Sequence, residues 1–337
     1  MDGLMVLSPG SLTTVQDGGR TGWSDSGVPP SGAADPRSMA LANLLLSNDP
    51  GEACLECTLS GPTLEFTGPA AFALAGADME PTLNGRPVPA WRALYAEQGD
   101  ILSLGTAVRG LRTCVALAGG LDLEPVLGSR STCLLAGFGG LEGRALRPGD
   151  RLDLRLQRPP AGLDGREIPP GDRLEPGAPI EPRAIRSHEE GLFRAGSAGT
   201  FFSASWRVSP ASDRMGLRLQ GPALSHVRGA GILSGGVRTG TVQVPGDGQP
   251  LVLMPDRQAT GGYARIAHVA TADLHLLGQA RPGDLLRFRE IGLAEARGLL
   301  LDAREELGRI ARELELARSF KVSLCGLDYL VRVLPAD

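Results

Sequence analysis

Glycine and proline divide this sequence into short apolar runs, and that punctuation limits what the chain can fold into more than any other feature. The 337 residues include 47 glycines and 26 prolines. The runs between them, such as 111–118 and 251–254, are rich in Val, Leu, Thr and Ala. Short runs of this composition bounded by turn residues are typical of strands. We therefore predict a mainly β fold.

Two short phrases recur along the chain. Gly-Asp followed by alternating apolar residues begins at Gly99, Gly149 and Gly283. Each predicts a turn that opens a strand, because alternation with period two places the apolar side chains on one face. A second phrase, Leu-x-Gly-Pro, occurs at 59–62 and at 219–222. Together they suggest two related β units in tandem, although short matches of this kind also arise by chance in a glycine-rich chain.

The remaining segments differ in composition from these β units. Residues 158–183 are dense in proline and glycine, which predicts a linker or a long surface loop. After Phe288, apolar residues recur at helical spacing and predict an amphipathic helix, with a possible break near Gly308. That helix is expected to pack on its own domain, with partner binding as the alternative. Residues 320–334 alternate around Gly326 and predict a terminal hairpin. The predicted organisation is a first unit at 1–157, a linker at 158–194, a second unit at 195–290, and a helix with a hairpin at 291–337.

Charge and hydropathy limit the partners and the location. The chain carries 34 basic and 38 acidic residues, spread along its length, which argues against a nucleic-acid or anionic-lipid partner. No apolar run reaches the length of about 18 residues that a membrane span needs, and the start lacks the pattern of a secretory signal. We expect a cytoplasmic protein with no membrane partner.

Several kinds of active site find little support in the sequence. Cys54 and Cys57 have C-x-x-C spacing, but no second pair or nearby histidine completes a metal site, so we predict no bound metal. The sequence contains neither a G-x-S-x-G elbow nor a standard phosphate-binding loop. Lys321 is the one lysine in the sequence, so a lysine nucleophile is nearly excluded. Anion binding would then fall to arginine or to backbone N–H groups.

Polar residues concentrate in three glycine-flanked clusters. A loop with Asp, Arg, Gln and Thr before two glycines can hold a small polar ligand, because a strand positions it and glycine allows close approach. The alternative is an Asp–Arg ion pair that merely pins each turn, and chemistry alone does not choose between the two. The clusters are 9–35 with Gln16, Asp17 and Arg20, 212–216 with Asp213 and Arg214, and 256–263 with Arg257, Gln258 and Thr260.

The same clusters carry a resemblance to a known family. The matching phrases run in order from about residue 4 to 290: Leu12-Thr-Thr-Val-Gln-Asp-Gly-Gly-Arg20, Gly27-Val-Pro-Pro-Ser-Gly, Leu127-Gly-Ser-Arg-Ser-Thr132, Gly137-Phe-Gly-Gly140, Gly143-Arg-Ala-Leu-Arg-Pro-Gly-Asp150, Ser212-Asp-Arg-Met-Gly216, Thr241-Val-Gln-Val-Pro245 and Asp256-Arg-Gln-Ala-Thr-Gly-Gly-Tyr263. The chain thereby resembles the family called 5-oxoprolinase C subunit, KipA-type protein or allophanate hydrolase subunit 2. It departs from the family pattern at Ser234-Gly-Gly-Val, where an acidic residue often follows the serine, and at Ala259, which replaces threonine or proline.

The resemblance implies a fold and partners. The fold would be two cyclophilin-like β-barrel units in tandem. The partners would be a KipI-like B subunit and a separate A subunit, in an enzyme that opens 5-oxoproline to L-glutamate with ATP hydrolysis. One alternative is the carboxyltransferase half of a biotin-dependent urea carboxylase, in which biotin arrives on another chain because this sequence has no Met-Lys attachment site. The other alternative is a KipA-type regulatory binding protein.

The resemblance also leads to expected roles for individual residues. Opening a lactam requires donors that face a developing oxyanion and a group that orients water. We expect Arg214 and Arg257 to bind a carboxylate or phosphate, and Gln16 and Gln258 to pair with an amide. The expected catalytic residues are Asp17, Asp213, Arg214 and Arg257, and the expected substrate-binding residues are Gln16, Arg20, Gln258 and Thr260. We further predict that all three clusters meet in one polar cleft.

Overall fold

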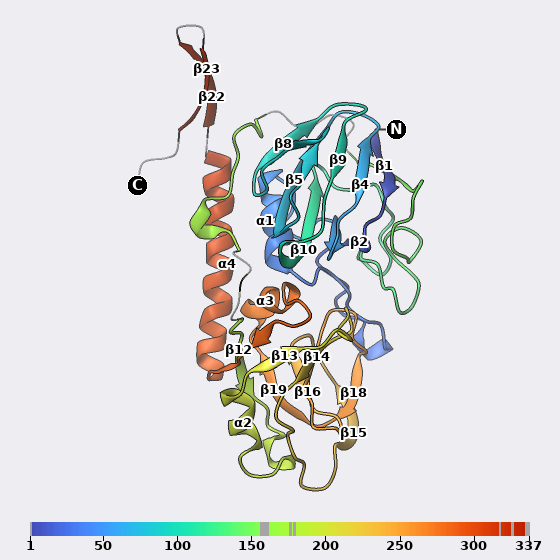
Figure 1. The fold of residues 1–337 in the computed structure, drawn as a ribbon, viewed down its shortest axis with the longest axis vertical. Coiled ribbons are helices and arrows are strands. Elements are labelled where there is room, and N and C mark those ends of the chain that lie inside the picture. Colours follow the sequence, from blue (N-terminus) through green and yellow to red (C-terminus); the bar gives the residue numbers. More distant parts are fainter. Residues whose placement is uncertain are drawn as a thin grey trace.

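The computed structural model describes residues 2–155, 162–174, 177, 180–316, 318–324 and 327–333. Two groups of strands lie one above the other, and a long helix runs along one side of both (Figure 1). The predicted mainly β fold with a C-terminal helix is confirmed. None of the helices in the described part of the chain is long and apolar enough to cross a bilayer.

The first unit consists of two antiparallel sheets that pack face to face. Their facing side chains form one core, in which Phe66 and Phe72 meet with ring centroids 5.3 Å apart. The six-stranded sheet has the order β11 (Arg151–Asp153), β1 (Gly3–Ser8), β4 (Thr63–Phe66), β9 (Ile101–Ser103), β6 (Thr82–Leu83) and β7 (Arg86–Pro87). The five-stranded sheet has the order β2 (Leu12–Gln16), β3 (Cys54–Thr58), β10 (Arg109–Leu117), β5 (Ala70–Asp78) and β8 (Ala93–Ala96).

One helix covers the outer face of the five-stranded sheet, and a second helix packs against the first. Helix α1 (Pro36–Leu45) packs on β5 and β10, and its N-terminus is capped by Asp35, which accepts from Ser38 N at 2.9 Å. Strand β5 alternates between large inward and small outward residues, and its outward alanines let the helix approach closely. Helix α4 (Leu293–Leu316) buries Ile310 and Leu314 in the same outer cluster.

Helix α4 thus packs on the body of its own chain, as predicted. The expected break near Gly308 is wrong, because the helix is continuous from Leu293 to Leu316. A glycine in a helix interior costs only about 1 kcal/mol, and burial of the apolar stripe around it outweighs that cost.

The second unit is built on one eight-stranded sheet. Its core includes Phe201 and Phe288, which stack with centroids 4.6 Å apart, and Trp206, whose Nε1 donates to the Phe201 carbonyl at 2.9 Å. Only β12 and β21 pair in parallel; the other neighbours in this sheet of the described chain are antiparallel. The order is β20 (Leu285–Leu286), β13 (Trp206–Val208), β14 (Gly216–Gln220), β17 (Leu251–Leu253), β16 (Thr241–Gln243), β19 (Arg265–Val269), β12 (Arg183–Arg186) and β21 (Arg289–Glu290).

Smaller elements complete the chain. The predicted terminal hairpin is confirmed, since β22 (Arg318–Leu324) pairs antiparallel with β23 (Leu327–Val333) beyond the end of α4 (Figure 1). Strand β12 lies inside the segment predicted as a linker, yet it belongs to the second sheet. The other elements are the ribbon of β15 (Gly231–Gly236) and β18 (Thr260–Tyr263), the helices α2 (Ser197–Ser203) and α3 (Leu274–Gly278), and the short 3-10 helices η1 (Ser24–Ser26), η2 (Pro170–Asp172), η3 (Glu190–Leu192) and η4 (Thr271–Asp273).

The three Gly-Asp phrases form the same turn. Gly99, Gly149 and Gly283 all have a left-handed backbone, with φ of 87°, 87° and 94°. In each turn the aspartate carboxylate accepts the backbone N–H three residues before it, at 2.7 to 2.8 Å, and a strand follows directly. The predicted turns are confirmed. The relatedness of the two units as tandem cyclophilin-like barrels, and their boundaries, stay predictions.

The close approach of the two units can be tested at Gly278. A methyl group added there would lie 2.3 Å from the Ala34 carbonyl oxygen of the first unit, whereas one added at Gly298 of α4 would meet nothing within 4 Å. We expect Gly278→Ala to lower the free energy of unfolding by about 1 to 3 kcal/mol. Gly298→Ala, the matched control, should raise it by up to about 1 kcal/mol. Urea unfolding measures both, and a similar effect of the two changes would contradict the proposed contact.

Candidate functional site

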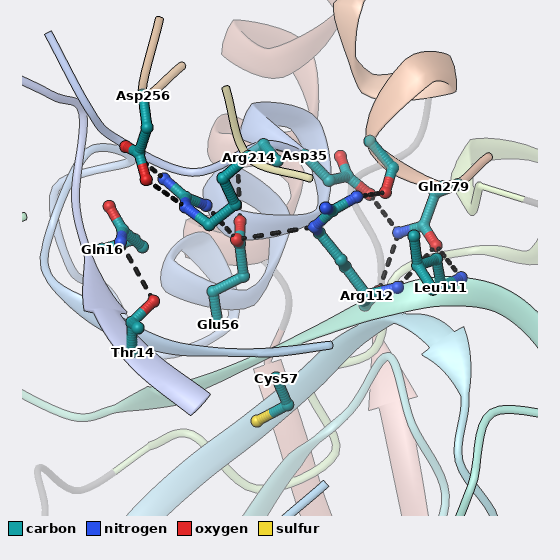
Figure 2. Close-up of polar contacts among 12 residues, drawn as sticks. Thr14, Gln16, Asp35, Glu56, Cys57, Leu111, Arg112, Arg214, Asp256 and Gln279 are labelled. Atoms are coloured by element: carbon teal, nitrogen blue, oxygen red, sulfur yellow. Dashed lines mark hydrogen bonds and ion pairs between the residues drawn. The ribbon is translucent and has the colours of Figure 1, made fainter. Parts of the chain in front are cut away.

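A network of buried polar side chains fills the seam between the two units (Figure 2). Its members come from both units, and each is at most 5% exposed. Polar groups buried so deeply are stable only when their hydrogen bonds and charges are satisfied. The network consists of Gln16, Asp35, Glu56, Arg112, Arg214, Asp256 and Gln279.

Glu56 lies at the centre of this network. It stands on β3, opposite Cys114 of β10, on the sheet face that looks toward the second unit rather than into the apolar core. Its Oε1 accepts from Nη1 of Arg214 and lies 3.7 Å from Nε of Arg112, and its Oε2 accepts from Ala34 N at 2.6 Å. One carboxylate of the first unit therefore pairs with arginines from both units (Figure 2).

Arg214 uses each of its three nitrogens within the protein. Nε and Nη2 donate to the Asp256 carboxylate at 2.9 and 3.1 Å, Nη2 also donates to the Gly32 carbonyl at 2.7 Å, and Nη1 donates to Glu56. Burial lowers the pKa of Arg214, but the carboxylates of Glu56 and Asp256 outweigh burial and raise that pKa overall. Arg214 is therefore a permanent cation that joins the two units.

Gln279 completes a strand at a place where the sheet is interrupted. The pairing of β10 with β5 shifts register between Arg109 and Thr113, which leaves backbone groups of Leu111 and Arg112 without a strand partner there. Gln279 Oε1 accepts from both N–H groups, at 2.9 and 3.1 Å, and its Nε2 donates to the Arg112 carbonyl at 2.7 Å and to Asp35 at 2.6 Å. The side-chain amide of Gln279 thus supplies the hydrogen bonds that a neighbouring strand would give to Leu111 and Arg112, and it also donates to Asp35, the N-cap residue of α1.

The residues of the first cluster hold loops together. Asp17 accepts from Gly19 N at 2.8 Å, from the hydroxyls of Ser129 and Ser131, and from Arg130 N at 2.5 Å. Gln16 Oε1 accepts from Gly32 N at 3.1 Å, while its Nε2 donates to Thr14 Oγ1 at 3.0 Å and to the Thr132 carbonyl at 3.2 Å. These contacts connect the loop after β2 to residues 129–132.

Arg20 is buried without a hydrogen bond to a carboxylate in the described chain. Its guanidinium donates to the carbonyls of Val126 and Ser131 and lies 4.7 Å from the ring centroid of Phe138. Burial lowers the pKa of Arg20, and the charges of Asp17 and Asp256 oppose that effect only in part.

The second and third clusters meet at a small cavity. Asp213 accepts from Met215 N at 2.8 Å and Gly216 N at 3.0 Å, and so closes its own turn. Asp213 and Gln258 both line a cavity of about 200 Å³, and Thr260 is exposed at the start of β18. The other residues that line this cavity are Met215, Gly216, Arg218, Leu251 and Leu253.

Residues of the three predicted clusters contact one another, but in a buried network and not in the one polar cleft that was predicted, since the cavity of about 200 Å³ is lined by no residue of the first cluster. Arg214 of the second cluster bonds to Asp256 of the third and to Gly32 of the first, and Gln16 bonds to Gly32 as well. Arg214 pairs with Asp256, which is distant in sequence, and not with its neighbour Asp213. The alternative prediction, an Asp–Arg ion pair within each turn, therefore does not describe this cluster. The catalytic and binding roles of these residues stay predictions.

Sequence reasoning missed Glu56, Arg112 and Gln279. Glu56 stands between apolar neighbours in Cys54-Leu-Glu-Cys57, and this pattern in the sequence indicates a buried charge. The cysteines themselves are packed in apolar clusters, and burial raises the pKa of the Cys57 thiol. Among the described residues, no group of three or more His, Cys, Asp and Glu side chains is placed to hold a metal ion.

Comparisons with known proteins agree with this architecture. A family model for the carboxyltransferase domain, subdomain A and B, matches residues 26–290. The 5-oxoprolinase C subunit of Escherichia coli (strain K12) is 40% identical over 312 residues, which cover 92% of this chain and 97% of that protein. The 5-oxoprolinase C subunit of Haemophilus influenzae is 36% identical and is matched over 86% of this chain and 92% of its own length. The crystal structure of the Kluyveromyces lactis urea carboxylase superposes with a TM-score of 0.84 at 31% identity, over 91% of this chain but only 29% of that one.

Glu56 offers a test of the buried network. Replacing it with glutamine removes the charge that compensates Arg214 and Arg112, so we expect Glu56→Gln to lower the free energy of unfolding by about 3 kcal/mol or more. The control is Glu295→Gln, which breaks an ion pair with Arg289 whose side chains are 46% and 56% exposed. An exposed pair is worth at most about 1 kcal/mol. Comparable losses for both variants in urea unfolding would show that the seam does not depend on Glu56.

Proposed function

Because the chain belongs to the carboxyltransferase domain, subdomain A and B, family, we propose that it is the C subunit of an ATP-dependent 5-oxoprolinase. The observation that carries the proposal is the 40% identity to the E. coli 5-oxoprolinase C subunit, which extends over 97% of that relative. By contrast, the structural match to the urea carboxylase covers only 29% of that much longer chain.

The proposed reaction opens the five-membered lactam of 5-oxoproline to L-glutamate. Amide resonance makes the lactam carbonyl a poor electrophile, and transfer of the γ-phosphoryl group of ATP to the amide oxygen, with release of ADP, would activate it. Attack by one water would then break the ring C–N bond, with the nitrogen leaving as the protonated amine, and a second water would hydrolyse the resulting acyl phosphate to L-glutamate and phosphate. Such a step needs hydrogen-bond donors aimed at the developing oxyanion and a group that orients water. The sequence has no standard phosphate-binding loop, so we assign ATP to the complex as a whole.

The structure supports different roles for the proposed site residues. We propose that Asp213 and Gln258 contact the substrate, because both line the cavity of about 200 Å³. Arg257, which precedes Gln258, and Thr260, the first residue of β18, are proposed to contact it too. The buried contacts of the remaining residues support a positioning role instead, since their side chains already bond to the protein. These positioning residues are Gln16, Asp17, Arg20 and Arg214.

The proposal includes partner subunits. The relatives that match almost end to end are named as one subunit of 5-oxoprolinase, so the activity of a complex is expected to require further chains. We propose that these are the A subunit and a KipI-like B subunit, and that the ATP-consuming complex works in the cytoplasm. The chain alone is expected to be inactive.

A carboxyltransferase half-site is the second candidate. The superposition on urea carboxylase favours it, with a TM-score of 0.84 over 91% of the chain. In that reaction biotin supplies the carboxyl group to be transferred. Lys321 follows phenylalanine rather than the methionine of a biotin-attachment site, so biotin would have to be carried by another chain.

The two candidates make different predictions for a tagged copy that is purified from its native cells with its bound partners. For an oxoprolinase subunit, we expect the eluate to form L-glutamate from 5-oxoproline in an ATP-dependent reaction, and the same chain stripped of partners to form none. ATP hydrolysis that requires urea, bicarbonate and a biotinylated chain would favour the carboxyltransferase instead. Glutamate formation by the chain alone would refute the need for partners.

A further inference from the structure

Arg257 carries a buried positive charge that no carboxylate compensates in the described part of the chain. Its side chain is 5% exposed, and its one hydrogen bond there runs from Nη1 to the carbonyl of Gln258 at 3.1 Å. Its Nε is buried without a partner. The neighbouring carboxylate of Asp256 is turned to Arg214 and accepts two hydrogen bonds from it.

The other arginines of the seam show what a structural cation looks like in this protein. Arg214 pairs with Glu56 and Asp256, and Nε of Arg112 lies 3.7 Å from Glu56. Burial alone lowers the pKa of the Arg257 guanidinium, and no neighbouring acid opposes that effect. A buried charge without a counter-charge destabilises the folded state. A bound anion would remove that cost.

The setting of Arg257 contains further unused donors. Its loop contacts the glycine-rich first cluster, because Ser31 N donates to the Pro255 carbonyl at 3.1 Å. Ser31 adopts a left-handed backbone with φ of 52°, and its buried hydroxyl has no hydrogen-bond partner among the described residues. Arg20 N donates to Pro30 in the same loop at 2.7 Å, and Arg20 Nη1 is likewise buried and unpartnered there. Two loops in backbone contact therefore hold three unsatisfied donor side chains.

We propose that Arg257 is the residue that binds the carboxylate group of the small-molecule substrate. A guanidinium presents two parallel N–H groups that fit a carboxylate, whereas hydroxyl and amide donors give only single contacts. Arg214 is unsuited to this task, because each of its nitrogens already donates within the protein. Gln258, the next residue along the chain, lines the cavity of about 200 Å³, whereas Arg257 is buried beside it in sequence and is not among the lining residues. The proposal places the rest of the ligand in this cavity.

The identity of the substrate rests on the proposed function, but the anion site does not. With 5-oxoproline as substrate, its carboxylate would pair with Arg257 and its lactam would lie toward Gln258. 2-Pyrrolidinone has the same lactam ring without the carboxylate, so it isolates the contribution of that one group. Inorganic phosphate and acetate test the site for anions in general.

The variant Arg257→Gln keeps a hydrogen-bonding side chain and removes the charge. In the partner-bound complex, we expect the KM for 5-oxoproline to rise about ten- to a hundredfold, with the KM for ATP unchanged. Arg207→Gln, which alters an exposed arginine of β13, should leave both unchanged. A rise in the KM for ATP alone would assign Arg257 to phosphate and overturn the proposal, as would unchanged values for both substrates.

Measurements on the purified chain separate this proposal from the proposed function. We expect 5-oxoproline and acetate, but not 2-pyrrolidinone, to raise the Tm of the wild-type chain and to have no such effect on Arg257→Gln. Without ligand, the variant should melt at or above the wild-type temperature, because it loses an uncompensated buried charge. A lower Tm without ligand would identify Arg257 as structural and refute its role. Stabilisation by acetate alone that depends on Arg257 would support the anion site and refute 5-oxoproline as its ligand.

Discussion

The carboxylate of Glu56 is the interaction on which the rest of this structure depends. The carboxylate points away from the apolar core of the first unit. Two arginines, one from each unit, approach it from that side. Loss of this carboxylate would leave Arg112 without its ion-pair partner and Arg214 with Asp256 alone, and breaking a buried pair in this way costs about 3 to 5 kcal/mol. Arg214 in turn bonds to the loops of the first and third clusters through Gly32 and Asp256, so Glu56 helps to set the geometry of the candidate site.

Local features of the fold could be predicted from sequence, and long-range ones could not. The Gly-Asp turns were predictable because a left-handed glycine and an aspartate that bonds back to the chain act within four residues. The ion pair between Arg214 and Asp256 could not be predicted, because the nearest aspartate in sequence is Asp213 and nothing local favours Asp256 instead. The residue types of the three clusters led to the prediction that they meet, but neither those types nor the family phrases gave any indication of Glu56 or Gln279, which lie outside the phrases.

Stability and binding impose opposite demands on the arginines of the seam. Arg214 is fully paired with protein carboxylates, whereas Glu56 offsets the burial of Arg112 only in part, and both arginines join the two units. Arg257 is buried to a similar degree without that compensation, which makes it costly for folding and available to a ligand. Proteins commonly carry such local costs at functional sites, where preorganisation for a ligand outweighs the loss of stability.

The amide of Gln279 has a consequence for how the chain folds during synthesis. It supplies the partner for Leu111 N, which precedes it by 168 residues. Ribosomes add roughly 5 to 20 residues per second, so the interrupted strand β10 waits on the order of ten to thirty seconds for that partner. During this interval Glu56 and Arg112 have no second unit to bury them, and water must hydrate both. The side of the first unit that faces the second therefore gains its last contacts only when nearly the whole chain has been synthesised.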